Sequence, residues 1–230
     1  MKLSLYKRVG WLCLLGLLGG TPAITGASEV GRGAMGKAGT MPKQCRPGKT
    51  STEALGWRWR TGTAVRIHYL ADNFDAAELT SLSRAVDNWN AALAETSSGV
   101  VFLLDEENAL ARRTGGFILV QRGVPRGKER VGELTIHSLF NGGVKLAITI
   151  SPVVTDLEAL TSLMTHELGH SLGLADCYEC RRGTTAMAAF KSTNKGNDVF
   201  EPSECDRYVV AAGYARTTDA ASNLSQNRLR

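Results

Sequence analysis

The run from Asp156 to Leu172 contains no proline and carries two histidines four residues apart. Such a run predicts an α-helix of about four to five turns. Thr155, followed three residues later by Glu158, is the pattern of a helix N-cap. A spacing of four places both imidazoles on one face of the helix, about one turn apart. The two rings can therefore bind the same metal ion.

The two histidines are His166 and His170, and Glu167 lies beside them. Two nitrogen donors suit zinc, and a catalytic zinc ion has three protein ligands and one open position. Gly173 can take the left-handed conformation that ends a helix and reverses the chain, which would bring the carboxylate of Asp176 back toward the histidines. We therefore expect His166, His170 and Asp176 to bind one catalytic Zn²⁺ ion.

From His166 to Asp176 the chain reads HELGHSLGLAD. This string resembles the extended zinc signature of the metzincin metalloproteases, with an aspartate in place of the family's third histidine. The replacement is similar to that in snapalysin-type small secreted bacterial proteases and in some bacterial matrixin-like proteins. The resemblance implies that Met187, eleven residues after Asp176, forms the methionine turn beneath the metal.

The resemblance covers roughly residues 60–214, although only the stretch from His166 to Met187 is specific. It implies an α+β fold, a metzincin-like catalytic domain at 57–214 with a twisted mixed β-sheet and two long helices. Residues 57–173 would form the upper lobe. Residues 174–214 would form a small C-terminal subdomain with a helix.

Local patterns predict the individual elements. Alternation of apolar and polar residues predicts strands, and apolar residues at spacings of three and four predict a helix after the capping box of Asp75 and Glu78. Asn141-Gly142-Gly143 predicts a hairpin between the last two strands. The predicted strands are 64–70, 100–104, 116–121, 131–137 and 144–150, and the last helix is Glu204–Tyr214, capped by Ser203.

The chain ends carry little core-forming sequence. Residues 1–27 have the basic start, short apolar run and small-residue end of a signal peptide, so we expect a secreted or periplasmic protein without stable membrane association. Their removal takes away three basic and no acidic side chains, and the net charge falls from +5 to +2. Residues 28–56 read as a flexible leader or short pro-segment, and 215–230 as a polar tail.

Four cysteines lie beyond the signal peptide, and an exported chain favours disulfides. One pairing joins Cys177 to Cys180 and Cys45 to Cys205, and another contains a bridge from Cys180 to Cys205. Cys177 and Cys180 could instead form half of a zinc site. Cys45 loosely resembles the latency cysteine of matrixin pro-segments but departs from that motif in residue order.

Other interpretations of the histidine pair remain. The two rings could be a solvated pair on a helix, but then Glu167, Gly173 and Asp176 would be coincidences. Glu201 or Glu204 could supply the third ligand from a second helix, but then Gly173 would have no role.

The resemblance implies a secreted zinc-dependent endopeptidase, in which Glu167 is the general base for a zinc-activated water. We expect a monomer with a protein or peptide substrate, which could pair with the strand 144–150 as a sheet edge. The alternatives are a zinc-containing binding or adhesion protein without turnover, and a zinc amidase acting on cell-wall peptide crosslinks. The short basic clusters at 122–130 and 181–182 are typical of solvated loops, so no nucleic-acid partner is expected. No residue is assigned as the oxyanion stabiliser.

Overall fold

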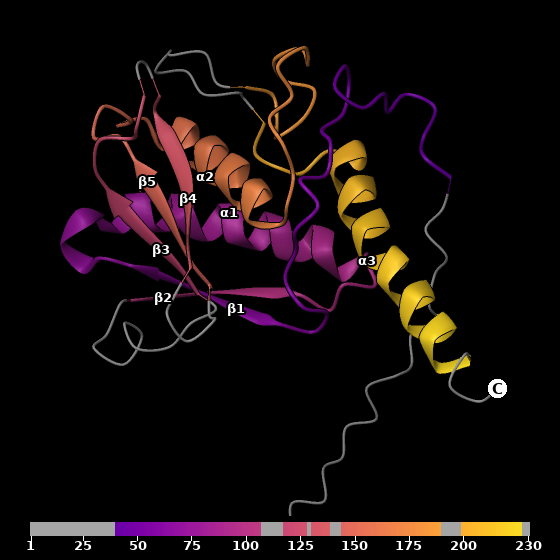
Figure 1. Cartoon of the computed structure of the whole chain (residues 1–230). Helices are drawn as coiled ribbons and strands as arrows, with labels where there is room; N and C mark the ends of the chain where they lie inside the picture. Colours follow the sequence, from indigo (N-terminus) through magenta and orange to yellow (C-terminus); the bar gives the residue numbers. More distant parts are fainter. Residues whose placement is uncertain (1–39, 107–116, 128–129, 139–143, 190–198, 227–230) are drawn as a thin grey trace, which may run out of the picture. The chain divides into compact units, whose positions relative to one another are not determined.

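The computed structural model describes residues 40–106, 117–127, 130–138, 144–189 and 199–226, with backbone alone for 216–226 (Figure 1). These ranges form a five-stranded mixed β-sheet and three α-helices, which confirms the α+β class. The predicted signal peptide, 1–27, and the first part of the predicted leader lie outside the described residues.

Five strands form the sheet. They are β1 (Ala64–Tyr69), β2 (Val101–Glu106), β3 (Phe117–Arg122), β4 (Gly132–Ser138) and β5 (Val144–Ile150). The strand β5 has the predicted bounds, and the others differ from the prediction by one or two residues at their ends. Local alternation was therefore enough to predict where the strands lie.

The strand order in the sheet is β2-β1-β3-β5-β4. The pairs β1–β2, β1–β3 and β3–β5 are parallel, and β4 pairs antiparallel with β5. The antiparallel pair fits the predicted hairpin, although its turn at 141–143 lies outside the described residues. The expectation that 144–150 is a sheet edge is wrong, because β5 lies between β3 and β4 and β4 is the edge strand.

Helix α1 (Ala76–Ala94) begins with the predicted capping box: Asp75 accepts from the N–H of Glu78 at 2.8 Å, and Glu78 accepts from the N–H of Asp75 at 2.9 Å. Helix α2 (Leu157–Ser171) begins one residue later than predicted. Its N-cap is Asp156, whose carboxylate accepts from the N–H of Ala159 at 2.7 Å. The aspartate takes the cap because its side chain reaches the third helical amide.

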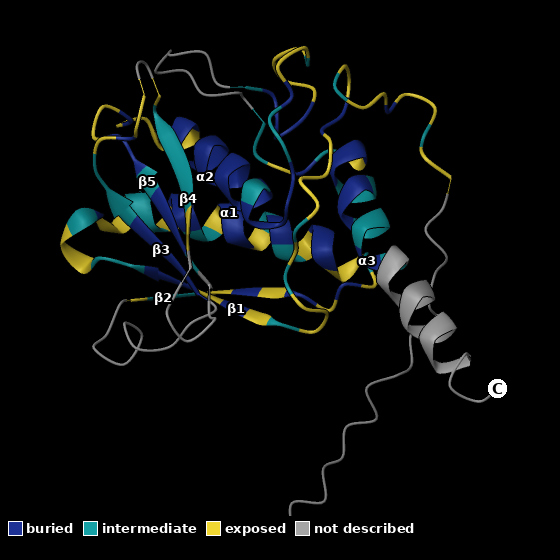
Figure 2. Ribbon diagram, in the orientation of Figure 1, coloured by how far each residue is buried: buried dark blue, intermediate teal, exposed yellow. Residues whose placement is uncertain are grey.

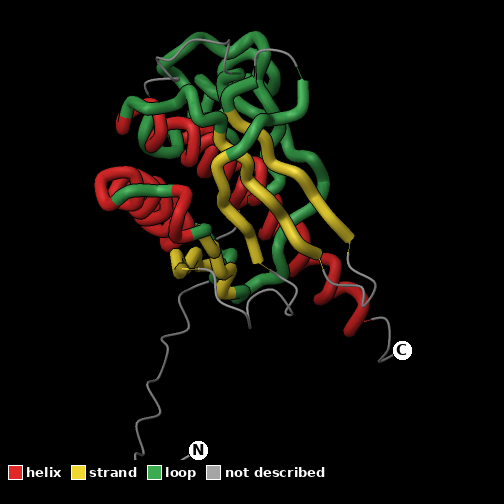
Figure 3. The backbone as a smooth tube through the Cα atoms, turned by 90° about the vertical axis from the view of Figure 1, so that its left-hand side faces the viewer, coloured by secondary structure: helices red, strands yellow, loops and turns green. Residues whose placement is uncertain are grey.

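The core lies between the sheet and the two helices α1 and α2. Val65 and Ile67 of β1 and Phe102 of β2 pack into one buried cluster with Trp89 of α1 and Leu163 of α2. Ala64 and Arg66 of β1 and Val101 and Leu103 of β2, which alternate with these residues, are exposed, so the helices cover one face of this part of the sheet. Figure 3 shows the strands side by side. In Figure 2, α2 is dark blue along most of its length, because it is buried on nearly every side.

Helix α3 (Glu204–Gln226) begins at the predicted residue. Ser203 caps it as predicted, because its Oγ accepts from the N–H of Asp206 at 3.1 Å. The helix continues beyond the predicted end at Tyr214, through residues that lack apolar periodicity. No helix in the described part of the chain is long and apolar enough to cross a membrane.

Two disulfides link the four cysteines, in the first of the two predicted pairings. Cys45 is bonded to Cys205 and Cys177 to Cys180, with Cα–Cα distances of 5.4 and 5.2 Å. Cys177 and Cys180 therefore do not form half of a zinc site in this structure. The Cys45–Cys205 bond ties the chain before β1 to the first turn of α3.

Candidate metal centre

The end of α2 reverses the chain as the sequence predicts. Gly173 has a φ of +85°, in the left-handed region where glycine has no steric cost. Its N–H donates to the carbonyl of His170 at 2.9 Å, and the N–H of Leu174 donates to the carbonyl of Gly169 at 3.1 Å. This pair of bonds is the Schellman arrangement of a glycine-ended helix. The chain therefore turns back within three residues of His170.

This reversal brings the three expected ligands together. The carboxylate Oδ1 of Asp176 lies 3.1 Å from Nε2 of His166 and 3.5 Å from Nε2 of His170. One possible ligand atom from each residue lies within 4.8 Å of the other two. His166 is buried, and the other two are partly exposed. The group can hold a metal ion.

Backbone carbonyls orient both imidazole rings. Nδ1 of His166 lies 2.8 Å from the carbonyl oxygen of Ala186, and Nδ1 of His170 lies 2.8 Å from that of Leu174. A carbonyl oxygen only accepts, so each Nδ1 carries the hydrogen and each neutral ring has its lone pair on Nε2. Both lone pairs then face the oxygen of Asp176. Three acceptor atoms this close need a cation or a shared proton between them, so the residues fit a metal ion.

Electrostatics within the group also favour a cation. Burial acts to raise the pKa of Asp176, but hydrogen bonds with His166 and His170 and their charges outweigh it, and the pKa lies far below its usual range. Burial acts to lower the pKa of His170, but the hydrogen bond with Asp176 and the charge of Glu167 outweigh it, and the pKa is raised. The centre therefore stabilises positive charge beside an ionised carboxylate.

Glu167 is buried next to the group. Burial raises its pKa above the ordinary value, and the nearby charges of His166 and His170 act in the opposite direction. Its Oε2 has no hydrogen-bond partner among the described residues. Gly132 of β4 makes room for the carboxylate, since a Cβ there would lie 2.6 Å from Oε1. A buried carboxylate with an unused oxygen is suited to exchanging a proton with a bound molecule.

A cavity of about 310 Å³ opens over these groups. Four parts of the chain contribute to its lining: α2, β4, the segment before β1 and the chain after Asp176. The lining includes Leu163, Gly132, Ile136, Leu55, Trp57 and Tyr178. The candidate metal centre is therefore open to a molecule that lies along β4.

Sequence reasoning missed Tyr178. Its side chain is 73% exposed at the cavity, and its O–H donates to Oδ2 of Asp176 at 3.2 Å. The negative charge of Asp176 raises the pKa of Tyr178, so the phenol keeps its proton and can donate. Its position two residues after Asp176, the expected third ligand, was the signal in the sequence that could have placed it at the site.

Met187 packs beneath the turn of α2 that separates the two histidines. It is fully buried, and a Cβ on Gly169 would overlap its Sδ. Trp89 of α1 is also close, because its Cζ2 would lie 3.2 Å from the same Cβ. Met187 thus lies against the turn of α2 between the two histidines, and Gly169 leaves space for its sulfur. Its role as a methionine turn stays a prediction.

Replacing Gly169 with alanine is expected to lower the free energy of unfolding by about 1–3 kcal/mol, because the added methyl group overpacks the contact with Met187. The matched control is Gly213→Ala in α3, where a Cβ meets nothing within 4 Å. That variant should raise the free energy of unfolding by about 0.5–1 kcal/mol through helix propensity. Urea unfolding of metal-free protein measures both. Equal effects of the two variants would contradict the packing argument.

Asp206 of α3 is a second residue that the sequence analysis missed. Its carboxylate is fully buried and accepts from Thr185 Oγ1 at 2.5 Å and from the N–H of Ala186 at 3.0 Å. It also accepts from the N–H and hydroxyl of Ser203, at 2.9 and 2.8 Å. Because the carbonyl of Ala186 bonds to His166, Asp206 helps to fix that ring through the backbone of one residue.

The remaining candidates lie elsewhere. His166, His170 and Asp176 form the one metal-suited group among the described residues, and neither Glu201 nor Glu204 belongs to it. Glu204 accepts instead from the side-chain amide of Gln44 at 2.6 Å. Cys45 is in a disulfide and cannot act as a latency ligand in this state.

A scan against protein-family models finds no match for this chain, and neither does a search of curated proteins. Its function must therefore be inferred from the geometry of the centre and the chemistry of its residues.

Proposed function

We propose that this protein is a secreted zinc-dependent endopeptidase with a metzincin-like fold. The observation that carries the proposal is the convergence of His166, His170 and Asp176 within 4.8 Å beside the buried carboxylate of Glu167, at the floor of an open cavity. Two imidazoles and one carboxylate with an adjacent glutamate match the needs of metal-assisted hydrolysis.

Zinc is the metal that we propose, with His166, His170 and Asp176 as its ligands. Two imidazole nitrogens suit zinc better than Ca²⁺ or Mg²⁺, which prefer oxygen ligands. When bound, zinc supplies Lewis-acid chemistry, which polarises a peptide carbonyl and lowers the pKa of water. The hydrogen bonds from each Nδ1 to a backbone carbonyl hold the ligands in the required tautomer.

The substrate that we propose is an extended peptide paired with β4. This strand is at one edge of the sheet, so the side away from β5 can offer its backbone groups to another chain. Gly132, Leu134 and Ile136 of β4 line the cavity. Ile136 is 52% exposed, which suits contact with an apolar substrate side chain. A peptide in this position would pass over Glu167.

Glu167 exchanges the protons of the reaction. Its carboxylate accepts a proton from the attacking water and then donates it to the leaving amine. A pKa raised by burial favours this return step, because the side chain holds the proton more readily. Glu167 would be ionised when it accepts that proton, because a cation held by His166, His170 and Asp176 would act against the effect of burial on its pKa.

Two features support the extracellular part of the proposal. The two disulfides are typical of proteins that fold in an oxidising compartment. Residues 1–27 have the pattern of a signal peptide.

Digestion of unfolded casein tests the proposal. The purified chain is expected to cleave casein, to lose the activity on treatment with a chelator, and to regain it when Zn²⁺ is added at one equivalent per chain. Mg²⁺ at the same concentration should not restore it.

The other outcomes identify the alternatives. A chain that binds zinc but cleaves neither casein nor cell-wall material would be a metal-containing binding protein. Chelator-sensitive activity on cell-wall peptide crosslinks alone would make it an amidase. Casein cleavage that survives complete metal removal would contradict the proposed chemistry.

A further inference from the structure

The segment from Cys45 to Trp57, which we call the N-terminal segment, packs beside the candidate metal centre. Most of it belongs to the predicted leader, yet the side chains of Ser51 and Thr52 are fully buried. In Figure 1 the indigo trace of this segment runs beside the orange chain that follows α2. Burial of polar side chains requires specific partners, which indicates a defined position.

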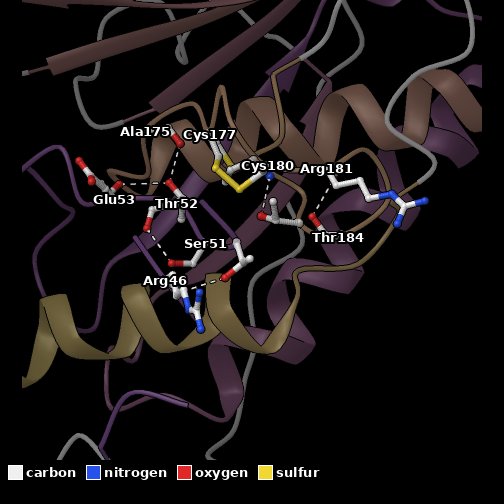
Figure 4. Close-up of a disulfide and its surroundings, with 12 residues drawn as sticks. Arg46, Ser51, Thr52, Glu53, Ala175, Cys177, Cys180, Arg181 and Thr184 are labelled. Carbon is white, nitrogen blue, oxygen red and sulfur yellow. Dashed lines mark hydrogen bonds between the residues drawn. A yellow bond between two sulfur atoms is a disulfide. The ribbon is translucent and has the colours of Figure 1, made fainter. Parts of the chain in front are cut away.

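The N-terminal segment pairs with the residues that lead to the third ligand. The N–H of Ala175 donates to the carbonyl of Glu53 at 2.8 Å, and the N–H of Leu55 donates to that of Gly173 at 2.6 Å, in antiparallel arrangement. The Thr52 hydroxyl donates to the carbonyl of Ala175 at 2.5 Å. Figure 4 shows Thr52 and Glu53 facing Ala175, next to the Cys177–Cys180 disulfide. The backbone just before Asp176 is thus held by hydrogen bonds at both the N–H and the carbonyl of Ala175.

The contact is close enough to select a residue type. A Cβ on Gly173 would overlap the carbonyl oxygen of Trp57. Gly173 therefore serves both the helix end and the approach of the N-terminal segment. Leu55 and Trp57 continue from this contact into the lining of the cavity.

The N-terminal segment is itself anchored to α3. Cys45 is bonded to Cys205, and next to it the side-chain amide of Gln44 donates to Glu204 at 2.6 Å. The same turn of α3 carries Asp206, which bonds to the N–H of Ala186. The first turn of α3 therefore holds both the backbone that orients His166 and the segment that pairs with the chain before Asp176.

The three ligands differ in how firmly the fold holds them. His166 and His170 lie on the buried helix α2, whereas Asp176 lies beyond its end on an irregular stretch. Without support, the stretch around Asp176 would lose conformational entropy when its carboxylate binds a metal, and this loss would weaken metal binding. A segment that orders the stretch beforehand removes that loss.

We infer that residues Thr52–Leu55 are a positioning element for Asp176, which preforms the third ligand of the metal centre. The inference rests on the metal site of the proposed function. It also implies that the part of the predicted leader from Cys45 onward belongs to the working protein, because removing it would release the stretch before Asp176.

Thr52→Val tests this role with little change in shape. It removes the hydroxyl bond to Ala175, and we expect the dissociation constant for Zn²⁺, measured by chelator competition, to rise about 10- to 100-fold. Thr52→Ser keeps the hydroxyl and should bind zinc nearly as tightly as the parent. Thr63→Val is the matched control, because it removes a threonine bond of 2.6 Å to the carbonyl of Arg60, away from the centre.

A merely structural role predicts a different pattern. In that case Thr52→Val would lower the urea midpoint of the metal-free protein with no change in zinc affinity, as we expect for Thr63→Val. That result would overturn the inference. A rise in the zinc dissociation constant for Thr52→Val that serine reverses would support it.

Hydrogen exchange of the metal-free parent gives an answer without any variant. The amides of Ala175 and Leu55 should exchange slowly before zinc is added, because their partners are already in place. Exchange at the rate of an unfolded chain until zinc is added would mean that the metal orders the stretch, and would overturn the inference.

The two proposals fail separately. If the parent hydrolyses no peptide but Thr52→Val binds zinc more weakly than the parent, the proposed peptidase activity would be wrong and the positioning role would stand. Chelator-sensitive hydrolysis, with zinc binding unchanged in Thr52→Val, would support the peptidase and overturn the positioning role. A parent that binds no Zn²⁺ would overturn both.

Discussion

Replacing Glu167 with glutamine is expected to lower kcat for peptide hydrolysis by about 10²- to 10⁴-fold while the protein keeps its zinc. Glutamine has nearly the size of glutamate and fits the buried site beside Gly132, but its amide cannot take a proton from water. The ligand atoms of His166, His170 and Asp176 are unchanged in this variant. The loss should therefore fall on the chemical step, with KM nearly unaffected.

The measurement combines steady-state hydrolysis of a peptide substrate with metal analysis of the same preparation. Glu158→Gln is the matched control, because Glu158 lies on the same helix but is exposed at its first turn. It should have parental kcat. If Glu167→Gln with one zinc per chain hydrolysed peptides at the parental rate, Glu167 would not be the base.

The helices, the strands and the candidate ligands could be predicted because they depend on neighbours in the sequence. The spacing of His166 and His170 places their rings on one face of any helix, and Gly173 ends that helix by a local bond pattern. The capping box at Asp75 is equally local. The N-cap of α2 was misplaced by one residue because Thr155 and Asp156 are both good caps, and only the backbone conformation selects between them.

What could not be predicted depends on pairs of residues far apart in the chain. Nothing in the alternation of β4 or β5 indicates which of them is the edge strand. The bond from Thr52 to Ala175 spans 123 positions. The Cys45–Cys205 disulfide spans 160, and its alternatives stayed open until the fold placed these cysteines together. The polar composition of 28–56 predicted a flexible leader, because the bonds that join Glu53 and Leu55 to the chain after α2 are between backbone groups, which leave no trace in the side-chain pattern.

Replacing Asp206 with alanine is expected to lower the free energy of unfolding by about 3–5 kcal/mol, a large share of the stability of an ordinary domain. The substitution leaves the buried hydroxyl of Thr185 and the N–H of Ala186 without their acceptor. It also removes the bonds that begin α3 at Ser203. Urea unfolding of the metal-free protein measures the effect. The control is Asp87→Ala on α1, an exposed aspartate whose removal should change stability by less than about 0.5 kcal/mol.

A double-mutant cycle that combines Asp206→Ala with Thr185→Val separates the energy of the Thr185–Asp206 hydrogen bond from the other effects of Asp206→Ala on stability. Thr185 donates to Asp206 and accepts from the N–H of Met187, so the two residues belong to one network. Residues in one network should show a coupling energy of about 0.5–3 kcal/mol. Additive effects would mean that Asp206 does not stabilise the backbone at Met187 through Thr185.

The same network should affect zinc binding, because the carbonyl of Ala186 orients His166. Asp206→Ala is expected to lower zinc affinity by about 10- to 100-fold, a loss that Asp87→Ala should not show.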